Sequence, residues 1–304
     1  MKKFVLITFI SLFIFSACKY GADNIFYPQN SVHNREKNIT YLSNTGVEGL
    51  SSSYSFAVMT DVHYWALEFQ KAPAMPDSEF LSWLDALPSS EKPGFCLVLG
   101  DVVDYGAAEQ YPAYVSFIDN IESRNVKVFN VAGNHDLYNS GWDNWRSNCY
   151  PHTSFYNFKT SGFSFYGLDT GSGGPGYEQL TSLQSAFSVD SKPKIVFSHY
   201  PFFSDSLVFS MCDTTERNLA LDMFQKNNVR LYLCGHIHKY ELYDFGTLRH
   251  LALPSFRYDG IWALVTVDES SGTYSVKFYN KNAYVCNKFL NLLNSKGYEK
   301  MIKY

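Results

Sequence analysis

Five short segments of the sequence carry residue types that bind metal ions or move protons. They read DVH at 61–63, GDVVD at 100–104, GNHD at 133–136, SHYP at 198–201 and GHIH at 235–238. Five of the eight histidines lie in these segments. Oxygen and nitrogen donors without a thiolate suit Mn, Fe or Zn, rather than a structural zinc site built from cysteines. The donors outnumber the ligands of one tetrahedral ion, which favours two divalent ions sharing a carboxylate.

Each of these segments follows an apolar run typical of a buried strand. The five predicted strands are 56–60, 95–99, 126–131, 194–198 and 230–234. In open α/β sheets, ligands gather beyond the carboxyl ends of parallel strands, so we expect the five segments to converge.

Local spacing suggests how these segments present their side chains. Residues i and i+2 of an extended chain point the same way, so Asp61 is expected to pair with His63, and His236 with His238. Three glycines suit sharp exits from the strands close to the site; these are Gly100, Gly133 and Gly235.

Each residue also has a structural interpretation when it is taken alone. Asp61 or Asp104 could cap a helix, His199 could be a buried histidine with satisfied hydrogen bonds, and Asp136 could begin a turn. Matching chemistry at five strand ends is hard to produce by accident, so the joint pattern favours one common site.

The order of the five motifs resembles that of the calcineurin-like metallophosphoesterases. That family has D-x-H, G-D-x-x-D, G-N-H-D or E, a lone H, and G-H-x-H, and every motif is intact here between about residues 54 and 255. The resemblance implies an α/β fold, a four-layer α/β/β/α sandwich with mixed sheets. It also implies a dinuclear centre of divalent ions, with Mn, Fe or Zn as candidates.

The resemblance also implies a role for each residue of the motifs. Three would hold one ion: Asp61, His63 and His238. Three would hold the other: Asn134, His199 and His236. Asp101 would bridge the two ions, and His135 would protonate the leaving oxygen or face the phosphate as a cation, oriented by Asp104. A metal-bridging hydroxide would attack the phosphate ester directly, because two ions lower the pKa of a shared water.

Differences between this sequence and related families narrow the choice of subfamily. Purple acid phosphatases carry a tyrosine at the position of Asp104 and lack a histidine at that of His63, so this protein should not be purple. Ser/Thr protein phosphatases have Glu at the position of Asp136. The segment 100–136 most resembles the bacterial cyclic-nucleotide phosphodiesterase-like branch.

The pattern of apolar and polar residues outside the five motifs predicts a layered α/β domain over 53–304. Apolar stripes at helical spacing fall at 80–87 and 111–121, and DTTE at 213–216 resembles a capping box that opens a helix to about residue 226. Alternating aromatic residues predict hairpins at 153–170 and 261–280. A short amphipathic helix is expected at 288–294, without an assigned function.

The N-terminus is typical of a bacterial export signal. Residues 1–17 hold two lysines, an apolar run and small residues before Cys18, which stands where a lipoprotein is acylated. This predicts a signal peptide at 1–17, lipidation of Cys18, a tether at 18–52 and an exported, membrane-anchored lipoprotein, periplasmic or on the cell surface. The alternative is an ordinary cleaved signal with a chance cysteine. The lipid would be the only contact with the membrane.

The remaining cysteines do not indicate a disulfide framework. Without Cys18 there are five cysteines, an odd number with no CxxC spacing. A bridge between Cys149 and Cys212 is possible, but no feature of the sequence supports it.

Charge and composition bound the function further. The net charge of −4 offers no basic field for a nucleic-acid backbone, which argues against a dedicated nucleic-acid partner and against a nuclease. We therefore expect a small phosphorylated substrate, a phosphate mono- or diester of nucleotide or other type. The rival from another class is a lipid-anchored binding or adhesion protein that keeps the fold with vestigial activity.

Aromatic residues between the motifs have two interpretations. They could form a rim that stacks on a base or aryl group, or they could be ordinary packing in a chain that is 17% aromatic. The residues in question are Tyr64, Trp65, Trp142, Trp145, Tyr200, Phe202 and Phe203.

Overall fold

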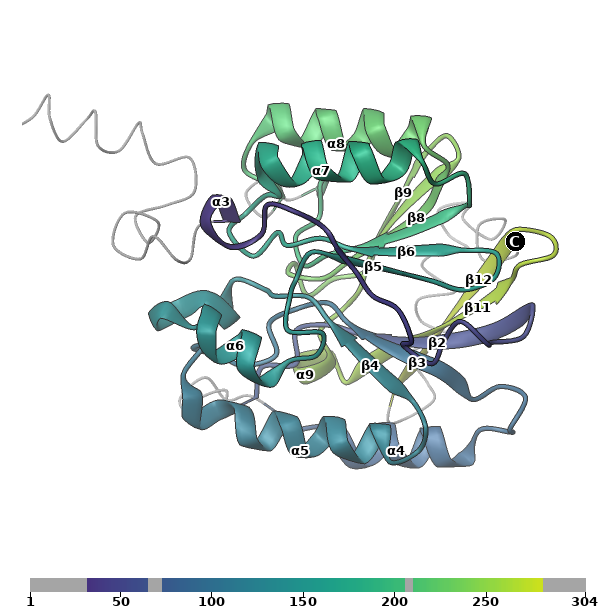
Figure 1. Ribbon diagram of the computed structural model, residues 1–304. Helices are drawn as coiled ribbons and strands as arrows, with labels where there is room; N and C mark the ends of the chain where they lie inside the picture. Colours follow the sequence, from purple (N-terminus) through teal and green to yellow (C-terminus); the bar gives the residue numbers. More distant parts are fainter. Residues whose placement is uncertain (1–31, 65–72, 206–209, 281–304) are drawn as a thin grey trace, which may run out of the picture.

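The computed structural model describes residues 32–64, 73–205 and 210–280 (Figure 1). Several predictions lie outside these residues: the signal peptide, Cys18, the tether up to residue 31, Trp65 and the helix at 288–294.

The first sheet has five strands in the order β12-β11-β2-β3-β4. Their bounds are β2 (Ser53–Met59), β3 (Pro93–Val98), β4 (Lys127–Asn130), β11 (Ile261–Asp268) and β12 (Thr273–Asn280). β2, β3 and β4 are parallel, whereas β11 runs antiparallel to both β2 and β12. The carboxyl ends of three parallel strands therefore lie at one edge of this sheet.

The second sheet has seven strands in the order β1-β5-β6-β7-β8-β10-β9. Their bounds are β1 (Thr40–Tyr41), β5 (Tyr156–Lys159), β6 (Ser164–Gly167), β7 (Lys194–Phe197), β8 (Val229–Cys234), β9 (Glu241–Phe245) and β10 (Leu248–Ala252). β6, β7, β8 and β10 are parallel neighbours, and the outer pairs β5 with β6 and β10 with β9 are antiparallel.

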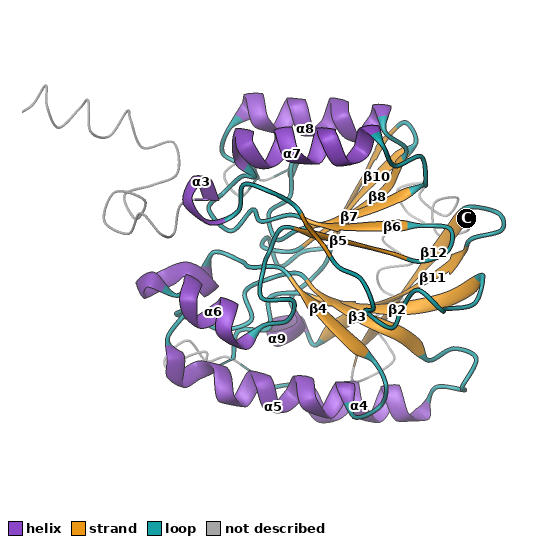
Figure 2. Cartoon of the chain, in the orientation of Figure 1, coloured by secondary structure: helices purple, strands orange, loops and turns teal. Residues whose placement is uncertain are grey.

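Helices cover the outer face of each sheet (Figure 2). The helices beside the five-stranded sheet are α4 (Asp77–Ala86), α5 (Tyr111–Glu122) and α6 (Trp142–Asn148), and those beside the seven-stranded sheet are α7 (Gly176–Ser188) and α8 (Thr214–Lys226). The short helical segments are α3 (Val32–Arg35), η3 (Ala108–Gln110), η4 (His135–Ser140) and α9 (Phe256–Asp259).

Three apolar clusters account for these layers. One joins the inner faces of the two sheets and contains Phe56 and Phe95 of one sheet with Phe158 and Phe165 of the other. The second lies between the five-stranded sheet and α4 and α5, and the third between the seven-stranded sheet and α7 and α8. The mixed α/β sandwich implied by the resemblance is thus confirmed.

The prediction of a tether up to residue 52 is wrong for the part that the structure describes. β1 pairs with β5, Val47 joins the core between the sheets, and Val32 is buried. Residues 32–52 therefore belong to the folded domain. Their polar composition resembles that of a linker because hydrogen bonds and ion pairs, rather than an apolar stripe, hold much of the segment in place.

The other predicted elements agree closely with the structure. The five predicted strands correspond to β2, β3, β4, β7 and β8, and both predicted hairpins form. Asp213 caps α8 by accepting hydrogen bonds from the backbone N–H groups of Thr215 and Glu216.

Two further properties follow from the described residues. Cys149 and Cys212 are both free thiols, so the bridge considered between them does not form. No described helix has both the length and the apolar character needed to cross a bilayer.

Candidate metal centre

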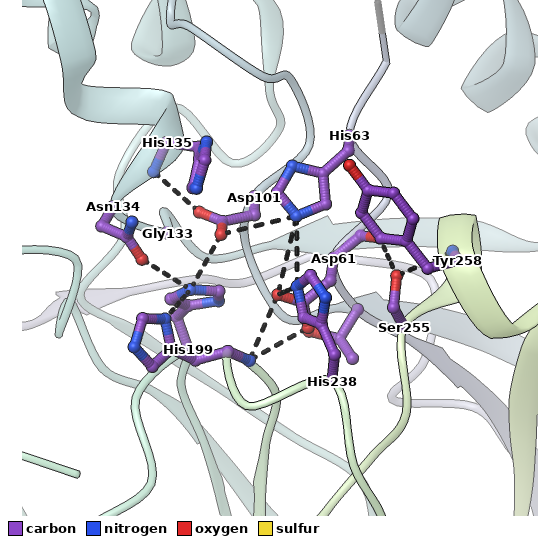
Figure 3. A network of polar contacts seen from close by, with 12 residues as sticks. Asp61, His63, Asp101, Gly133, Asn134, His135, His199, His238, Ser255 and Tyr258 are labelled. Carbon is purple, nitrogen blue, oxygen red and sulfur yellow. Dashed lines mark hydrogen bonds and ion pairs between the residues drawn. The ribbon is translucent and has the colours of Figure 1, made fainter. Parts of the chain in front are cut away.

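The five motifs converge at one edge of the two sheets, where the loops after β2, β3, β4, β7 and β8 meet (Figure 3). Asp61, His63, Asp101 and His199 are buried, whereas Asn134, His135, His236 and His238 are partly exposed. The cluster therefore has a buried floor and an open side from which a substrate can enter.

The backbone at these side chains is not extended, in contrast to what the spacing of the motifs suggested. Asp61, His63, Asp101, His236 and His238 all have positive φ, between 47° and 68°. Left-handed backbone is rare for residues other than glycine and is concentrated at functional sites. The prediction that each D-x-H or H-x-H pair is a piece of extended strand is thus wrong.

The residue between the members of each pair is an apolar one, and both of these residues, Val62 and Ile237, belong to the apolar clusters. His236 and His238 face different groups of donors: His236 lies with Asp101 and His199, and His238 with Asp61 and His63.

Two of the glycines permit the loops to approach each other. A Cβ atom on Gly133 would lie 2.1 Å from Oδ1 of Asp101, and one on Gly235 would lie 1.8 Å from Oγ1 of Thr60. Neither position has room for a side chain, as expected from the sequence.

The first group of donors consists of Asp61, His63 and His238. Nε2 of His238 lies 3.1 Å from Oδ1 of Asp61 and 3.3 Å from Nε2 of His63. Nδ1 of His63 faces Oδ1 of Asp104 at 3.2 Å, which turns its Nε2 toward the group.

The second group surrounds one nitrogen of His199. Its Nε2 lies 3.1 Å from Oδ1 of Asn134, 3.2 Å from Nδ1 of His236 and 3.2 Å from Oδ2 of Asp101. Nδ1 of His199 lies 2.8 Å from the carbonyl oxygen of Leu99, to which it can donate its hydrogen. A single hydrogen on Nε2 could not serve three partners, whereas a shared cation would attract all of them.

The spacing of these donors fits divalent ions. Donors bound to one ion at about 2.1 Å, at tetrahedral or octahedral angles, lie roughly 3.0–3.4 Å apart. Five contacts of 3.1–3.3 Å fall in that range, whereas Oδ1 of Asp61 and Nε2 of His63 lie 4.0 Å apart. Asp101 faces both groups, because its Oδ2 lies 3.2 Å from Nε2 of His199 and 3.8 Å from Nε2 of His63.

The buried charges of the site also favour cations. Burial opposes the ionisation of Asp61 and Asp101, but the neighbouring histidines outweigh it and hold the pKa of both carboxyls below the ordinary range. Burial lowers the pKa of His199, yet the Asp101 carboxylate outweighs it and raises that pKa to about 9. Burial and then the charge of His199 lower the pKa of His236 to about 3. Two buried carboxylates thus demand positive charge, from protons or from metal ions.

His135 stands apart from the two groups as a residue free to act on a substrate. Its Nδ1 can donate to the backbone carbonyl oxygen of Asp104 at 2.9 Å, and its imidazole lies edge-on to that of His63. The Asp104 carboxylate is nearer to Nδ1 of His63, at 3.2 Å, than to Nδ1 of His135, at 3.7 Å. Asp104 therefore contacts both histidines, one mainly through its side chain and the other mainly through its backbone.

Asp136 supports the turn that carries His135. Its fully buried carboxylate accepts hydrogen bonds from the backbone N–H groups of Val102, Val103 and Gly133, at 2.8–3.1 Å. The side chain thereby joins the loop after β3 to the loop after β4.

The structure brings three further residues to the site that the sequence did not single out: Tyr258, Ser255 and Tyr138. The Tyr258 ring stacks on His238 with a centroid distance of 5.3 Å, and Ser255 donates a hydrogen bond from its hydroxyl to the backbone oxygen of Asp61 at 2.8 Å. The hydroxyl of Tyr138 accepts a hydrogen bond from Nδ2 of Asn134 at 3.2 Å. Ser255 and Tyr258 follow β10, another parallel strand whose carboxyl end points to the site. Recognising β10 in the sequence would have located them.

The aromatic residues considered as a rim divide between the two interpretations. Trp142, Trp145 and Phe202 are buried in the apolar clusters and are packing residues. Tyr200 is partly exposed and stacks on His236 with a centroid distance of 3.8 Å.

Comparisons with known proteins agree with this site. The family model described as calcineurin-like phosphoesterase matches residues 54–240, more than half of the chain. No curated protein matches the sequence. Among solved structures, a dimetal phosphatase from Danio rerio is similar with a TM-score of 0.59 and 15% identity, covering 75% of this chain and 96% of that one.

Two further structures share the fold. A purple acid phosphatase from yellow lupin has a TM-score of 0.59 and 14% identity, covering 77% of this chain and 52% of its own. GAP50, described as the anchor in the inner membrane complex of Plasmodium, has a TM-score of 0.54 and 16% identity, covering 75% of this chain and 85% of its own.

At these identities the solved structures establish the fold, and the match to the family model establishes the family. The five motifs of the sequence lie within the matched residues and at the edge where the structure gathers the two groups of donors. The chain therefore belongs to the calcineurin-like phosphoesterases, a family of phosphoester hydrolases with a dinuclear metal centre.

Proposed function

We propose that the protein hydrolyses phosphate mono- or diesters of small, nucleotide-type molecules at a centre of two divalent ions. The observation that carries this proposal is the position of Asp101. One carboxylate oxygen, Oδ2, faces His199 of one donor group and His63 of the other. A carboxylate between two sets of donors is the arrangement that a bridged pair of ions requires.

The assignment of ligands follows the two groups. Asp61, His63 and His238 would hold one ion. Asn134, His199 and His236 would hold the other, with Asp101 shared between them. When bound, the ions would supply a hydroxide nucleophile near neutral pH and neutralise charge on the phosphate oxygens. The mixed oxygen and nitrogen donors suit Mn, Fe or Zn.

The residues of the chain would do the remaining work. His135 lies at the open side of the site, and the hydrogen bond between its Nδ1 and the Asp104 carbonyl holds its ring in place. Its Nε2 would give a proton to the leaving oxygen, or face the phosphate as part of a cation. Because no side chain here is proposed to attack phosphorus, the reaction would proceed without a phosphoenzyme.

The substrate class is proposed from the rim of the site. Tyr200 and Tyr258 are partly exposed and stack on His236 and His238, so an aromatic group such as a base can extend over them. The resemblance of segment 100–136 to the bacterial cyclic-nucleotide phosphodiesterase-like branch also favours a nucleotide. With a net charge of −4, a long nucleic acid is not favoured.

The location is proposed from the sequence of the N-terminus. The apolar run before Cys18 favours an exported bacterial lipoprotein, anchored by acyl chains on that cysteine. The phosphoesterase domain would then act in the periplasm or at the cell surface, on esters that reach it from outside the cytoplasm.

A binding or adhesion protein is the second candidate. The similarity to GAP50, which is described as an anchor, favours it because that protein has the same fold. A protein that used the fold only for binding would be free to lose metal ligands. All seven candidate ligands are present in this chain, and this favours the enzyme.

The experiment compares hydrolysis of p-nitrophenyl phosphate and bis-p-nitrophenyl phosphate by the purified protein with added Mn, Fe or Zn. Cyclic nucleotides, nucleoside monophosphates and phospholipid headgroups form the second panel. Metal-dependent turnover that is lost on chelation supports the proposal. A protein that binds the ions but hydrolyses none of the panel would favour the binding candidate.

A further inference from the structure

Residues 32–36, which we name the N-terminal strap, are held in the folded domain by buried polar contacts. The sequence predicted a tether here, but Val32 and Glu36 are 1% and 8% exposed, and the side chain of Arg35 is 1% exposed. Burying a charged side chain in a polar segment is costly unless it is paired, so its partners indicate what the strap does.

Arg35 forms a bidentate ion pair, which we also call two-pronged, with Asp169. Its Nε donates to Oδ2 of Asp169 at 2.9 Å and its Nη2 to Oδ1 at 2.8 Å, and its Nη1 donates to Oγ of Ser172 at 3.0 Å. Asp169 is fully buried. Two parallel hydrogen bonds between Arg and a carboxylate fix orientation as well as distance.

The loop that begins at Asp169 contacts the chain neighbours of two candidate ligands. Oγ1 of Thr170 accepts a hydrogen bond from the backbone N–H of Tyr200, next to His199, at 2.9 Å. Gly171 packs so closely that a Cβ atom there would lie 2.9 Å from the carbonyl oxygen of Gly133, the residue before Asn134.

Glu36 reaches the same place by a second route. Its Oε1 accepts a hydrogen bond from the backbone N–H of Ser154 at 2.9 Å. Oγ of Ser154 in turn accepts one from the backbone N–H of Ala132 at 2.8 Å. Ala132 lies two residues before Asn134, on the loop after β4.

Both routes reach the backbone within two residues of Asn134 or His199, which belong to one of the two donor groups. We propose that the strap positions the ion held by Asn134, His199 and His236, with Arg35 and Glu36 as positioning residues. This inference rests on the proposed function. It extends that function by making one of the two ions dependent on a segment distant in sequence.

The strap sets an expectation for metal affinity. Residues that orient ligands typically change metal affinity 10- to 100-fold when they are mutated. Arg35→Gln should therefore lower the affinity for one ion 10- to 100-fold and leave the affinity for the other within about twofold of the wild-type value. Arg35→Lys keeps the charge but cannot form the two-pronged pair, so it should rescue the loss only in part.

The experiment is a calorimetric titration of the full-chain, metal-free protein with Mn²⁺, together with electron paramagnetic resonance of the loaded samples. Coupled Mn²⁺ pairs give a signal that isolated Mn²⁺ does not, and Arg35→Gln should lose it at Mn²⁺ concentrations that saturate the wild type. The matched control is Arg124→Gln. Arg124 forms the same two-pronged pair with Asp85, at 2.8 and 2.9 Å, on the surface at the end of α5. The Arg124→Gln variant should bind both ions as the wild type does.

The outcomes separate the strap from the proposed function. A wild type that binds fewer than two ions contradicts the function. A wild type that binds two ions, with Arg35→Gln unchanged or with both of its ions weakened equally, contradicts the strap alone. If Arg35→Gln does not fold, Ser154→Ala, which removes only the acceptor for Ala132, decides by the same criterion. It should weaken the same single ion.

Discussion

The backbone N–H of His135 donates a hydrogen bond to Oδ1 of Asp101 at 2.8 Å. The other oxygen of the same carboxylate faces the imidazoles of His199 and His63. Asp101, the residue proposed to bridge the ions, thus also fixes the backbone of His135, the residue proposed to protonate the leaving group. One side chain therefore contributes both to metal binding and to the position of the proton donor.

Replacing Asp101 should therefore remove both functions. Asp101→Ala is expected to lose at least one of the two ions and to lower kcat/KM for p-nitrophenyl phosphate by more than about 100-fold. Metal analysis of the dialysed protein and steady-state kinetics measure the two effects. Asp85→Ala, on the surface, is the control. Unchanged activity in Asp101→Ala would overturn the assignment of the site.

His135→Ala should separate chemistry from metal binding. The variant is expected to keep both ions and to lose about 10²- to 10⁴-fold in turnover, the usual contribution of a general acid. The loss should be larger for an alkyl phosphate than for p-nitrophenyl phosphate, because a poor leaving group depends more on protonation. His152→Ala changes an exposed histidine and is the matched control. Equal losses for both substrates would argue against proton donation.

Asp136 should matter for stability more than for metal chemistry. Asp136→Ala leaves three backbone N–H groups without an acceptor, and each buried unpaired group costs about 1–3 kcal/mol. We expect the free energy of unfolding to fall by at least about 3 kcal/mol, with a smaller loss for Asp136→Asn, which keeps one acceptor oxygen. Urea unfolding measures this. A loss below 1 kcal/mol for the alanine variant would contradict it.

Acid should destabilise the fold through His250. Burial among aromatic rings lowers the pKa of His250 from its ordinary value of 6.5 to about 3. Because its folded-state pKa is depressed, His250 favours folding above pH 6.5, and this contribution declines as the pH falls toward 3. The slope is about 1.4 kcal/mol for each pH unit.

His250→Phe removes the proton-binding site while keeping a ring of similar size. The difference in unfolding free energy between the wild type and His250→Phe should shift in favour of the variant as the pH falls from 7 to 5. Urea unfolding at several pH values measures this difference. A difference that stays constant with pH would show that His250 does not titrate in this way.

Much of the candidate site could be predicted because its signal is local. Each ligand follows an apolar run of four or more residues, and parallel strands bring their carboxyl ends together whatever the loops between them do. Gly133 and Gly235 were predictable for the same reason, since each stands between a buried strand and a polar ligand. The four layers followed from the resemblance, and alternating apolar periods supported them.

The features that the sequence did not reveal depend on distant contacts. Arg35 is ordered by Asp169, which lies 134 positions away, and neither residue belongs to an apolar pattern. Asp61 and His63, both of positive φ, donate hydrogen bonds from their backbone N–H groups to the carbonyl oxygens of Gly100 and Asp101, in the loop after β3. Tyr258 reaches His238 because β10 joins the sheet beside β8, a pairing that no local motif announces. The burial of Trp142 and Trp145 was equally invisible in so aromatic a chain.

The most direct test of the central claim is anomalous diffraction from crystals of the protein grown with Mn²⁺. The dinuclear assignment predicts two peaks, one among Asp61, His63 and His238 and the other among Asn134, His199 and His236, with Asp101 contacting both. A single peak, or manganese bound away from these side chains, would contradict it.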